Sequence, residues 1–166
     1  MLKKIAALVQ GQAHCVLATA DGDAPHASLM SFCADQDSRE FWLATRRDTR
    51  KYRNLAANPR ASLLIDDRIV GDRVVGDREA GDRTPGSGPN QALTVTAESR
   101  PFATQDDARR ARAALLARRP ALADFLADPL VEVLRLVATD YQLLTGLTEV
   151  LVMEAEKILD APAAKA

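Results

Sequence analysis

The chain has few of the residue types that mark metal sites or nucleic-acid-binding surfaces. It has only two cysteines and two histidines, and its aromatic content is 4%. Zinc sites need several cysteines or histidines at short spacing, and surfaces that stack on nucleic-acid bases need aromatic side chains. We therefore predict no metal site and no nucleic-acid partner.

Neither sign of charge predominates, and no apolar run is long. The 22 lysines and arginines are balanced by 23 aspartates and glutamates, so no overall basic field attracts nucleic acid or an anionic membrane. No run approaches the roughly 20 apolar residues of a membrane helix, and Gln10 and Gln12 interrupt the apolar N-terminus. We expect a cytoplasmic protein without membrane contact, in which Cys15 and Cys33 are buried free thiols.

What the chain does have is a hydrophobic content of 47%, enough to build a core. Residues 1–159 are expected to form one domain, followed by a flexible tail at 160–166. Periodicity predicts helices at 1–11, 48–57, 106–119 and 120–127. It predicts strands at 14–19, 27–34, 40–45, 61–65 and 92–97, with Pro25 just outside the second, and a final hairpin of 130–137 and 141–147 that turns near Thr139-Asp140. Strands and helices do not alternate, which favours an α+β fold around an antiparallel β-barrel.

A short tandem repeat interrupts this pattern. Residues 67–86 read DRIVG, DRVVG, DREAG and DRTPG. Four units of five residues cannot bury a core of their own. We therefore expect residues 67–90 to be a solvated loop insertion.

A basic cluster runs from Thr45 to Lys51, with the sequence Thr-Arg-Arg-Asp-Thr-Arg-Lys. Arginine, lysine, hydroxyl groups and the free N–H groups of a helix N-terminus are the partners that a phosphate binds. Charge alone leaves a solvated basic surface as an alternative.

The wider spacing resembles a known family. Thr45, Thr49-Arg50-Lys51 and then Asn58-Pro59-Arg60-Ala61-Ser62-Leu63-Leu64 resemble the flavin-binding region of the pyridoxamine 5′-phosphate oxidase-like family. This resemblance implies an antiparallel split β-barrel that binds FMN. It implies a phosphate site in the 45–51 segment and contacts to the flavin ring from the strand near residue 29 and from the start of a later strand. The implied cofactor-binding residues are Ser28, Leu29, Met30, Thr45, Arg46, Thr49, Arg50, Lys51 and Gln91.

The chain also departs from the family's oxidases. They carry arginine at the position equated with Ser28 and lysine near Cys33, and they end in an Arg- and Trp-containing segment that has no counterpart after Leu147. Oxidation of vitamin B6 is therefore not expected. Residues 103–128 are more similar to the haem-utilisation and general flavoprotein branches, and His26 is the histidine to test as a haem ligand.

These observations predict an FMN-binding oxidoreductase that acts on an unidentified small molecule. The family resemblance implies a homodimer with the cofactor at a two-fold interface. Two alternatives stay open: a reductase of the same fold that uses the deazaflavin cofactor F420, and a non-catalytic module that binds haem or flavin.

Overall fold

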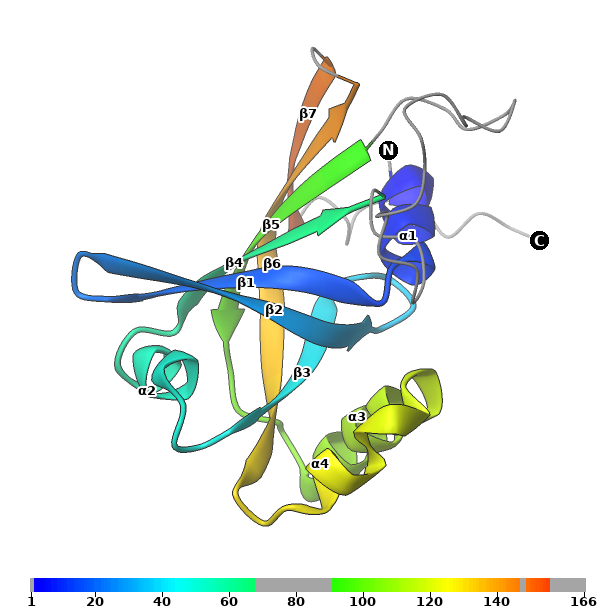
Figure 1. Ribbon diagram of the computed structural model, residues 1–166. Helices are drawn as coiled ribbons and strands as arrows, with labels where there is room; N and C mark the ends of the chain where they lie inside the picture. The colour runs from blue at the N-terminus through cyan, green and yellow to red at the C-terminus, as the bar shows by residue number, and fades with distance from the viewer. Residues whose placement is uncertain (1, 68–90, 147–148, 156–166) are drawn as a thin grey trace, which may run out of the picture.

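The computed structural model describes residues 2–67, 91–146 and 149–155 (Figure 1). Its strands are β1 (His14–Asp21), β2 (Ala24–Ala34), β3 (Glu40–Arg46), β4 (Arg60–Asp66), β5 (Gln91–Ser99), β6 (Val131–Thr145) and β7 (Glu149–Glu154). Its α-helices are α1 (Leu2–Gly11), α2 (Arg50–Ala57), α3 (Gln105–Arg118) and α4 (Ala123–Ala127), with a 3₁₀ turn at Pro120–Leu122. The predicted elements therefore exist, apart from the last hairpin.

The strands form one antiparallel sheet that closes on itself. Their order is β3-β2-β1-β4-β5-β6-β7, and β3 also pairs with β6 along seven residues, from Glu40 opposite Val137 to Arg46 opposite Val131. This additional pairing joins β3 to β6 and makes a closed ring of six strands, with β7 attached along the upper part of β6 (Figure 1). Closure satisfies backbone groups that an open sheet would leave at its edges. The expected α+β split barrel is confirmed.

The main core fills the inside of this ring. Along β1 and β2, burial alternates, so that Cys15, Leu17, Met30 and Phe32 point inward while Leu29 points outward. Helices α1 and α2 add apolar side chains to this core from opposite sides of the barrel as Figure 1 draws it. Burying this apolar surface is the main stabilising contribution to the fold.

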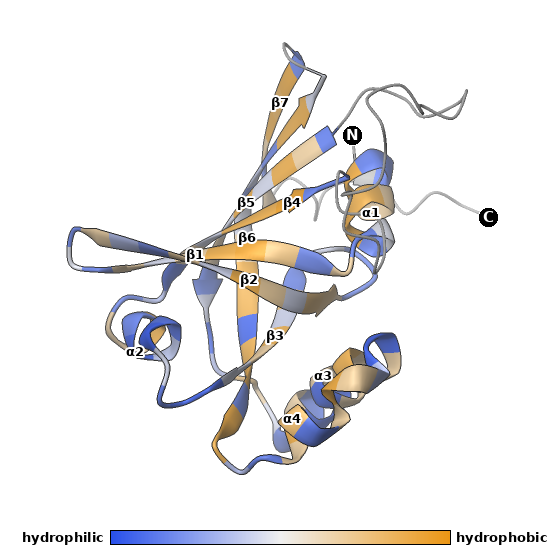
Figure 2. Cartoon of the chain, in the orientation of Figure 1, coloured by the Kyte–Doolittle hydropathy of each residue, from blue (hydrophilic) through white to orange (hydrophobic). Residues whose placement is uncertain are grey.

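A second, smaller core lies between the outside of the barrel and the pair α3 and α4. It is formed by Cys33 and Ala44 on the strands, Leu115 on α3, Leu126 on α4 and Val131 at the start of β6. Both cysteines are therefore buried and free, as predicted. Figure 2 shows α3 and α4 with mixed hydropathy, whereas α2 is largely hydrophilic.

The prediction for the last hairpin was wrong. Thr139 and Asp140 are not in a turn but inside β6, which runs without interruption from Val131 to Thr145 and then pairs with β7. Between Thr96 and Ala97 of β5 the register shifts, so Thr139 is the extra residue of a β-bulge, and its hydroxyl donates to Thr96 O at 3.2 Å. The polar pair that resembles a turn is a bulge that lets one long strand bend around the barrel.

The prediction that Pro25 lies outside β2 was also wrong, since Pro25 pairs with Ala20. The N–H of Phe32 donates to Ala13 O, and hydrogen-bonded pairs alternate in an antiparallel ladder. Pro25, seven positions earlier, therefore has its nitrogen on the side away from β1. Its missing N–H costs no ladder hydrogen bond.

The predicted loop insertion and the predicted flexible tail cannot be compared with the structure. The Asp-Arg repeat, apart from Asp67, and the tail at 160–166 lie outside the described residues. Among the described helices, none has the length and apolar character that crossing a membrane requires.

Candidate functional site

The candidate site lies where β2 and β3 separate. Their last paired residues are Phe32 and Leu43. Continued in the same register, Met30 would stand opposite Thr45, but here β3 turns away toward α2 while β2 continues with β1 as a long hairpin (Figure 1). The part of β2 from Ala24 to Ser31 thus has β1 on one side and an edge not paired with β3 on the other.

Two threonine hydroxyls lie where β3 meets α2. Thr45 is 2% exposed, and its Oγ1 lies 3.1 Å from Oγ1 of Thr49. Thr49 is the N-cap of α2, yet its hydroxyl donates to Arg46 O at 2.8 Å and makes no capping bond to the helix. The first N–H groups of α2 therefore receive no side-chain cap, and they remain available to an anion.

Two cations stand on the first turn of α2 without a partner among the described residues. Arg50 and Lys51 make no hydrogen bond or ion pair with any residue in the described part of the chain. The first turn of α2 contains no acidic residue. A helix N-terminus attracts negative charge, so this turn combines two free cations with an uncapped helix end.

Arg46, also predicted to contact the cofactor, is already engaged. Its guanidinium donates to both carboxylate oxygens of Asp48, at 3.1 and 3.0 Å, and forms an ion pair with Asp128. These contacts hold the end of β3 against the segment that precedes β6. They lower the pKa of Asp48, mainly through the hydrogen bond from Arg46. In this arrangement Arg46 positions the turn and offers no free charge.

The predicted residues of β2 divide between the two faces of the strand. Met30 is buried in the core, Ser28 is half-buried on the same inner face, and the Leu29 side chain is 66% exposed on the outer face. Since the ladder groups of Phe32, Met30 and Ser28 face β1, the backbone N–H and C=O of Leu29 face the edge that β3 has left. That edge offers backbone hydrogen bonds to a bound molecule.

Gln91 is not brought to this place within one chain. It begins β5 and pairs with Thr145, at one end of β6, whereas Thr45 pairs with Glu132 near the other end. The length of β6 therefore separates Gln91 from Thr45.

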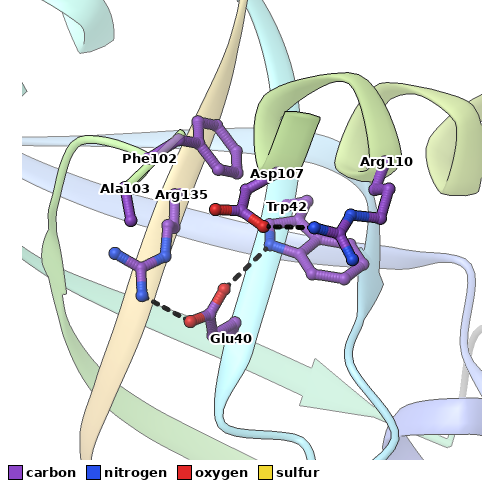
Figure 3. A pocket seen from close by; sticks show the side chains of 7 residues that line it. All are labelled: Glu40, Trp42, Phe102, Ala103, Asp107, Arg110 and Arg135. Carbon is purple, nitrogen blue, oxygen red and sulfur yellow. Dashed lines mark hydrogen bonds and ion pairs between the residues drawn. The ribbon is translucent and has the colours of Figure 1, made fainter. Parts of the chain in front are cut away.

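Two cavities lined by described residues lie away from this site. One, of about 370 Å³, is lined by Arg39, Arg100, Val137, Ala138, Thr139, Glu154 and Ala155. The other, of about 310 Å³, lies between α3 and the outer face of β3 and β6 and is lined by Glu40, Trp42, Phe102, Ala103, Asp107, Arg110 and Arg135 (Figure 3).

The charged groups of the smaller cavity are paired with one another. Glu40 accepts hydrogen bonds from Arg135 and from Trp42 Nε1, and Asp107 pairs with Arg110 at 2.9 Å (Figure 3). The hydrogen bond from Arg135 holds the pKa of Glu40 below its usual range. This cavity presents no unpaired charge to a ligand, and it lies on the opposite face of β3 from Thr45.

A model of the pyridoxamine 5′-phosphate oxidase family matches residues 1–159. The chain belongs to this family. No curated protein shows significant similarity to the sequence.

Solved structures of similar fold include haem proteins and a flavin-binding protein. A haem-binding protein from Mycobacterium smegmatis superposes with a TM-score of 0.75 at 18% identity, over 95% of this chain and 59% of that one. The haem storage protein HutZ from Vibrio cholerae gives 0.62 at 19% identity, over 89% and 97%. An FAD-binding protein from Mesorhizobium loti gives 0.64 at 12% identity, over 86% and 91%. At these identities the likeness establishes the pyridoxamine 5′-phosphate oxidase fold alone.

Sequence reasoning missed one polar contact beside the site of this family member. His26 Nε2 lies 3.2 Å from Ser28 Oγ. The two residues are two apart on one strand, so alternation alone could have put both side chains on the same face as Met30. Alternation does not say which face of β2 is the inner one. The closed barrel decides this and turns the face toward α2.

Proposed function

We propose that the protein binds FMN between β2 and α2 and acts in the cytoplasm as a homodimeric, flavin-dependent oxidoreductase of a small molecule. The observation that carries this proposal is a pair of cations on the uncapped first turn of α2, beside the hydroxyl of Thr45. These cations, Arg50 and Lys51, have no partner in the described part of the chain. Membership of the pyridoxamine 5′-phosphate oxidase family supports a flavin as the phosphate-bearing ligand, since flavin binding is common in this family.

The residues present fit such a group. Arg50 and Lys51 would neutralise the phosphate, and the N–H groups of the first turn of α2 would donate to its oxygens. The hydroxyl of Thr49 can rotate from Arg46 O to a phosphate oxygen, because a hydroxyl hydrogen turns freely about its C–O bond. The backbone of Leu29 would meet the polar edge of the flavin ring. When bound, the flavin supplies the transfer of hydride or electrons.

A second copy of the chain would complete the site. The outer face of β2, β1, β4 and β7 carries apolar side chains, among which Leu29 is 66% exposed, Leu64 37% and Val152 70%. Register places these three in one row across the sheet, with Val16, Thr94 and Gln142 between them. Leu29, Val16 and Leu64 are direct neighbours across β2, β1 and β4, and burial of their apolar surface would favour association. A two-fold partner that covers this row could also supply its own Gln91, which the chain's own fold keeps away from Thr45.

Removal of the two free cations tests the phosphate assignment. We expect Arg50→Ala with Lys51→Ala to weaken FMN binding by about 100-fold or more, because two charge-assisted contacts are lost. The dissociation constant is measured by the quenching of FMN fluorescence. The control is Lys3→Ala with Lys4→Ala, which removes two exposed cations from the start of α1. Equal affinity in the two double variants would contradict the proposal.

The absorption spectrum of the purified protein separates the proposal from its alternatives. A flavin spectrum supports FMN. A Soret band with no flavin spectrum would replace the proposal by haem binding, as in two of the structures of similar fold. Binding of F420 in preference to FMN, measured by competition, would assign the deazaflavin instead.

A further inference from the structure

A hydrogen-bonded His–Ser pair lies on the inner face of β2, in the part of the strand that β3 does not cover. His26 and Ser28 are both half-buried, and 3.2 Å separates the imidazole Nε2 from the serine Oγ. They lie two and four residues before Met30, on the same face of β2. Met30 is the residue that would stand opposite Thr45 if the pairing of β2 with β3 continued. The pair therefore lies on the same unpaired stretch of β2 that stands next to the phosphate-binding residues proposed above.

A chain of contacts leads from His26 to the cations of α2. His26 stands opposite Thr19 in a hydrogen-bonded position of the ladder, where the Cα atoms of partners lie about 5.5 Å apart. The hydroxyl of Thr19 accepts a hydrogen bond of 3.1 Å from the buried Asn54 amide of α2. Asn54 and Arg50 are four residues apart and share one face of the helix. His26 is thus paired with Thr19, the residue of β1 that contacts the face of α2 carrying Arg50.

The surroundings of His26 favour an anion. Helix α2 carries Arg50, Lys51 and Arg53, of which Arg53 donates to Asp48 O. The opposing charges are Asp21 and Asp23, both exposed at the tip of the β1–β2 hairpin. The hydroxyl of Ser28 can accept from or donate to the imidazole, so it holds the ring in place in either protonation state.

We infer that His26 is a further ligand-binding residue, which, oriented by Ser28, contacts the phosphate end of the ligand and holds it more tightly when protonated. This inference rests on the proposed FMN site and adds to it a dependence on pH. Histidine titrates near neutrality, unlike arginine and lysine. Binding should therefore strengthen as the pH falls through the range in which histidine gains a proton, which the two other cations cannot cause.

The test is the dissociation constant of FMN between pH 5.5 and 8.5 for the wild type and for His26→Gln. The phosphate of FMN itself gains a proton near pH 6. The same free ligand meets both proteins, so the ratio of their affinities removes the pH dependence that does not involve His26. We expect the affinity ratio of wild type to variant to rise about tenfold from pH 8.5 to pH 5.5, the size of one charge-assisted hydrogen bond. His14→Gln, which changes the chain's other histidine, should leave that ratio flat.

Riboflavin, which lacks the phosphate, is the second probe. Its affinity for the wild type and for His26→Gln should have the same pH dependence, since no phosphate is present for the imidazolium to contact. Two results would overturn the inference and leave the FMN site unaffected. One is the same pH dependence of FMN affinity in wild type and His26→Gln. The other is a rise of the affinity ratio with riboflavin that equals the rise with FMN. Failure of FMN to bind the wild type at any pH would overturn the proposed function and this inference together. His26→Asn replaces the glutamine variant if that protein does not fold.

Discussion

At the scale of single residues, burial determines the chemistry of the two thiols. Cys15 is 2% exposed in the main core, and Cys33 is 4% exposed in the smaller core beneath α3. Burial raises the pKa of Cys15 to about 12 and that of Cys33 to about 11. The thiolate is the reactive form of cysteine, and neither residue forms it at neutral pH. These thiols pack as small apolar groups in the two cores.

We expect both thiols to resist modification in the folded protein. At pH 8, a chromogenic disulfide reagent such as Ellman's reagent should react with less than one tenth of the thiols within minutes. In about 6 M guanidinium chloride both should react at once, because unfolding exposes them. Fast reaction of one thiol in the native protein would show that its core opens readily.

Single residues also divide the basic cluster by role. Of its arginines and its lysine, Arg46 is bound to Asp48 and Asp128, and Arg47 to Pro129 O and Glu132. Arg50 and Lys51 have no partner among the described residues. The cluster is therefore neither a uniform solvated surface nor a uniform phosphate site: part of it holds the loop and part is free.

At the scale of elements, the contact of β3 with β6 includes one ion pair that responds to pH. Glu40 on β3 accepts from Arg135 on β6, and both side chains are mostly buried, at 28% and 23% exposed. The pKa of Glu40 is lowered in the folded protein, chiefly by this hydrogen bond. A lowered carboxyl pKa stabilises the fold above the pKa of the unfolded chain, near 4.5. This stabilisation is lost as the pH falls through the lower value of the folded state.

Glu40→Gln should therefore destabilise the protein at neutral pH and have less effect in acid. We expect a loss of about 1 kcal/mol in the free energy of unfolding at pH 7, the size of a partly buried pair. Below pH 4 the difference from the wild type should shrink. Urea denaturation at both pH values measures it, with Glu98→Gln, in an exposed pair with Arg100, as the control. A pH-independent loss would assign the effect to packing against Trp42 instead.

At the scale of the whole molecule, the outer face of the barrel exposes several apolar side chains. The row of Leu29, Leu64 and Val152 crosses strands that are far apart in sequence, and β7 also exposes Val150 and Leu151. Within the described ranges, β7 pairs on one side only, with β6, and is an edge strand of the sheet. The proposed homodimer would remove both features from water.

Leu29→Glu with Val152→Glu should convert the proposed dimer to a monomer. Two carboxylates in the interface would be desolvated without partners, at a cost of several kcal/mol. Light scattering after size-exclusion chromatography gives the mass directly. Leu116→Glu, at an exposed position of α3, is the control and should remain dimeric. A wild-type protein with the mass of one chain would contradict the homodimer.

The sequence by itself determined the local elements and the basic motif from Thr45 to Lys51, because both depend on neighbours a few residues away. Turn residues and apolar periodicity predicted six of the seven strands. They also predicted a helix over 48–57, which the structure places at Arg50–Ala57 with Thr49 as its N-cap. The sequence did not predict β7 or the uninterrupted course of β6, because polar residues such as Thr139 occur both in bulges and in turns.

Only the tertiary structure decided which of the candidate residues are free and which meet. Arg46 is engaged because Asp128, 82 positions later, lies beside it, and this contact has no local signal. His26 faces α2 because Thr19 and Asn54, 35 positions apart, join the strand to the helix. Closure of β3 on β6 carries Gln91 away from Thr45. These relations depend on hydrogen bonds and packing between distant segments, which form only when the barrel closes.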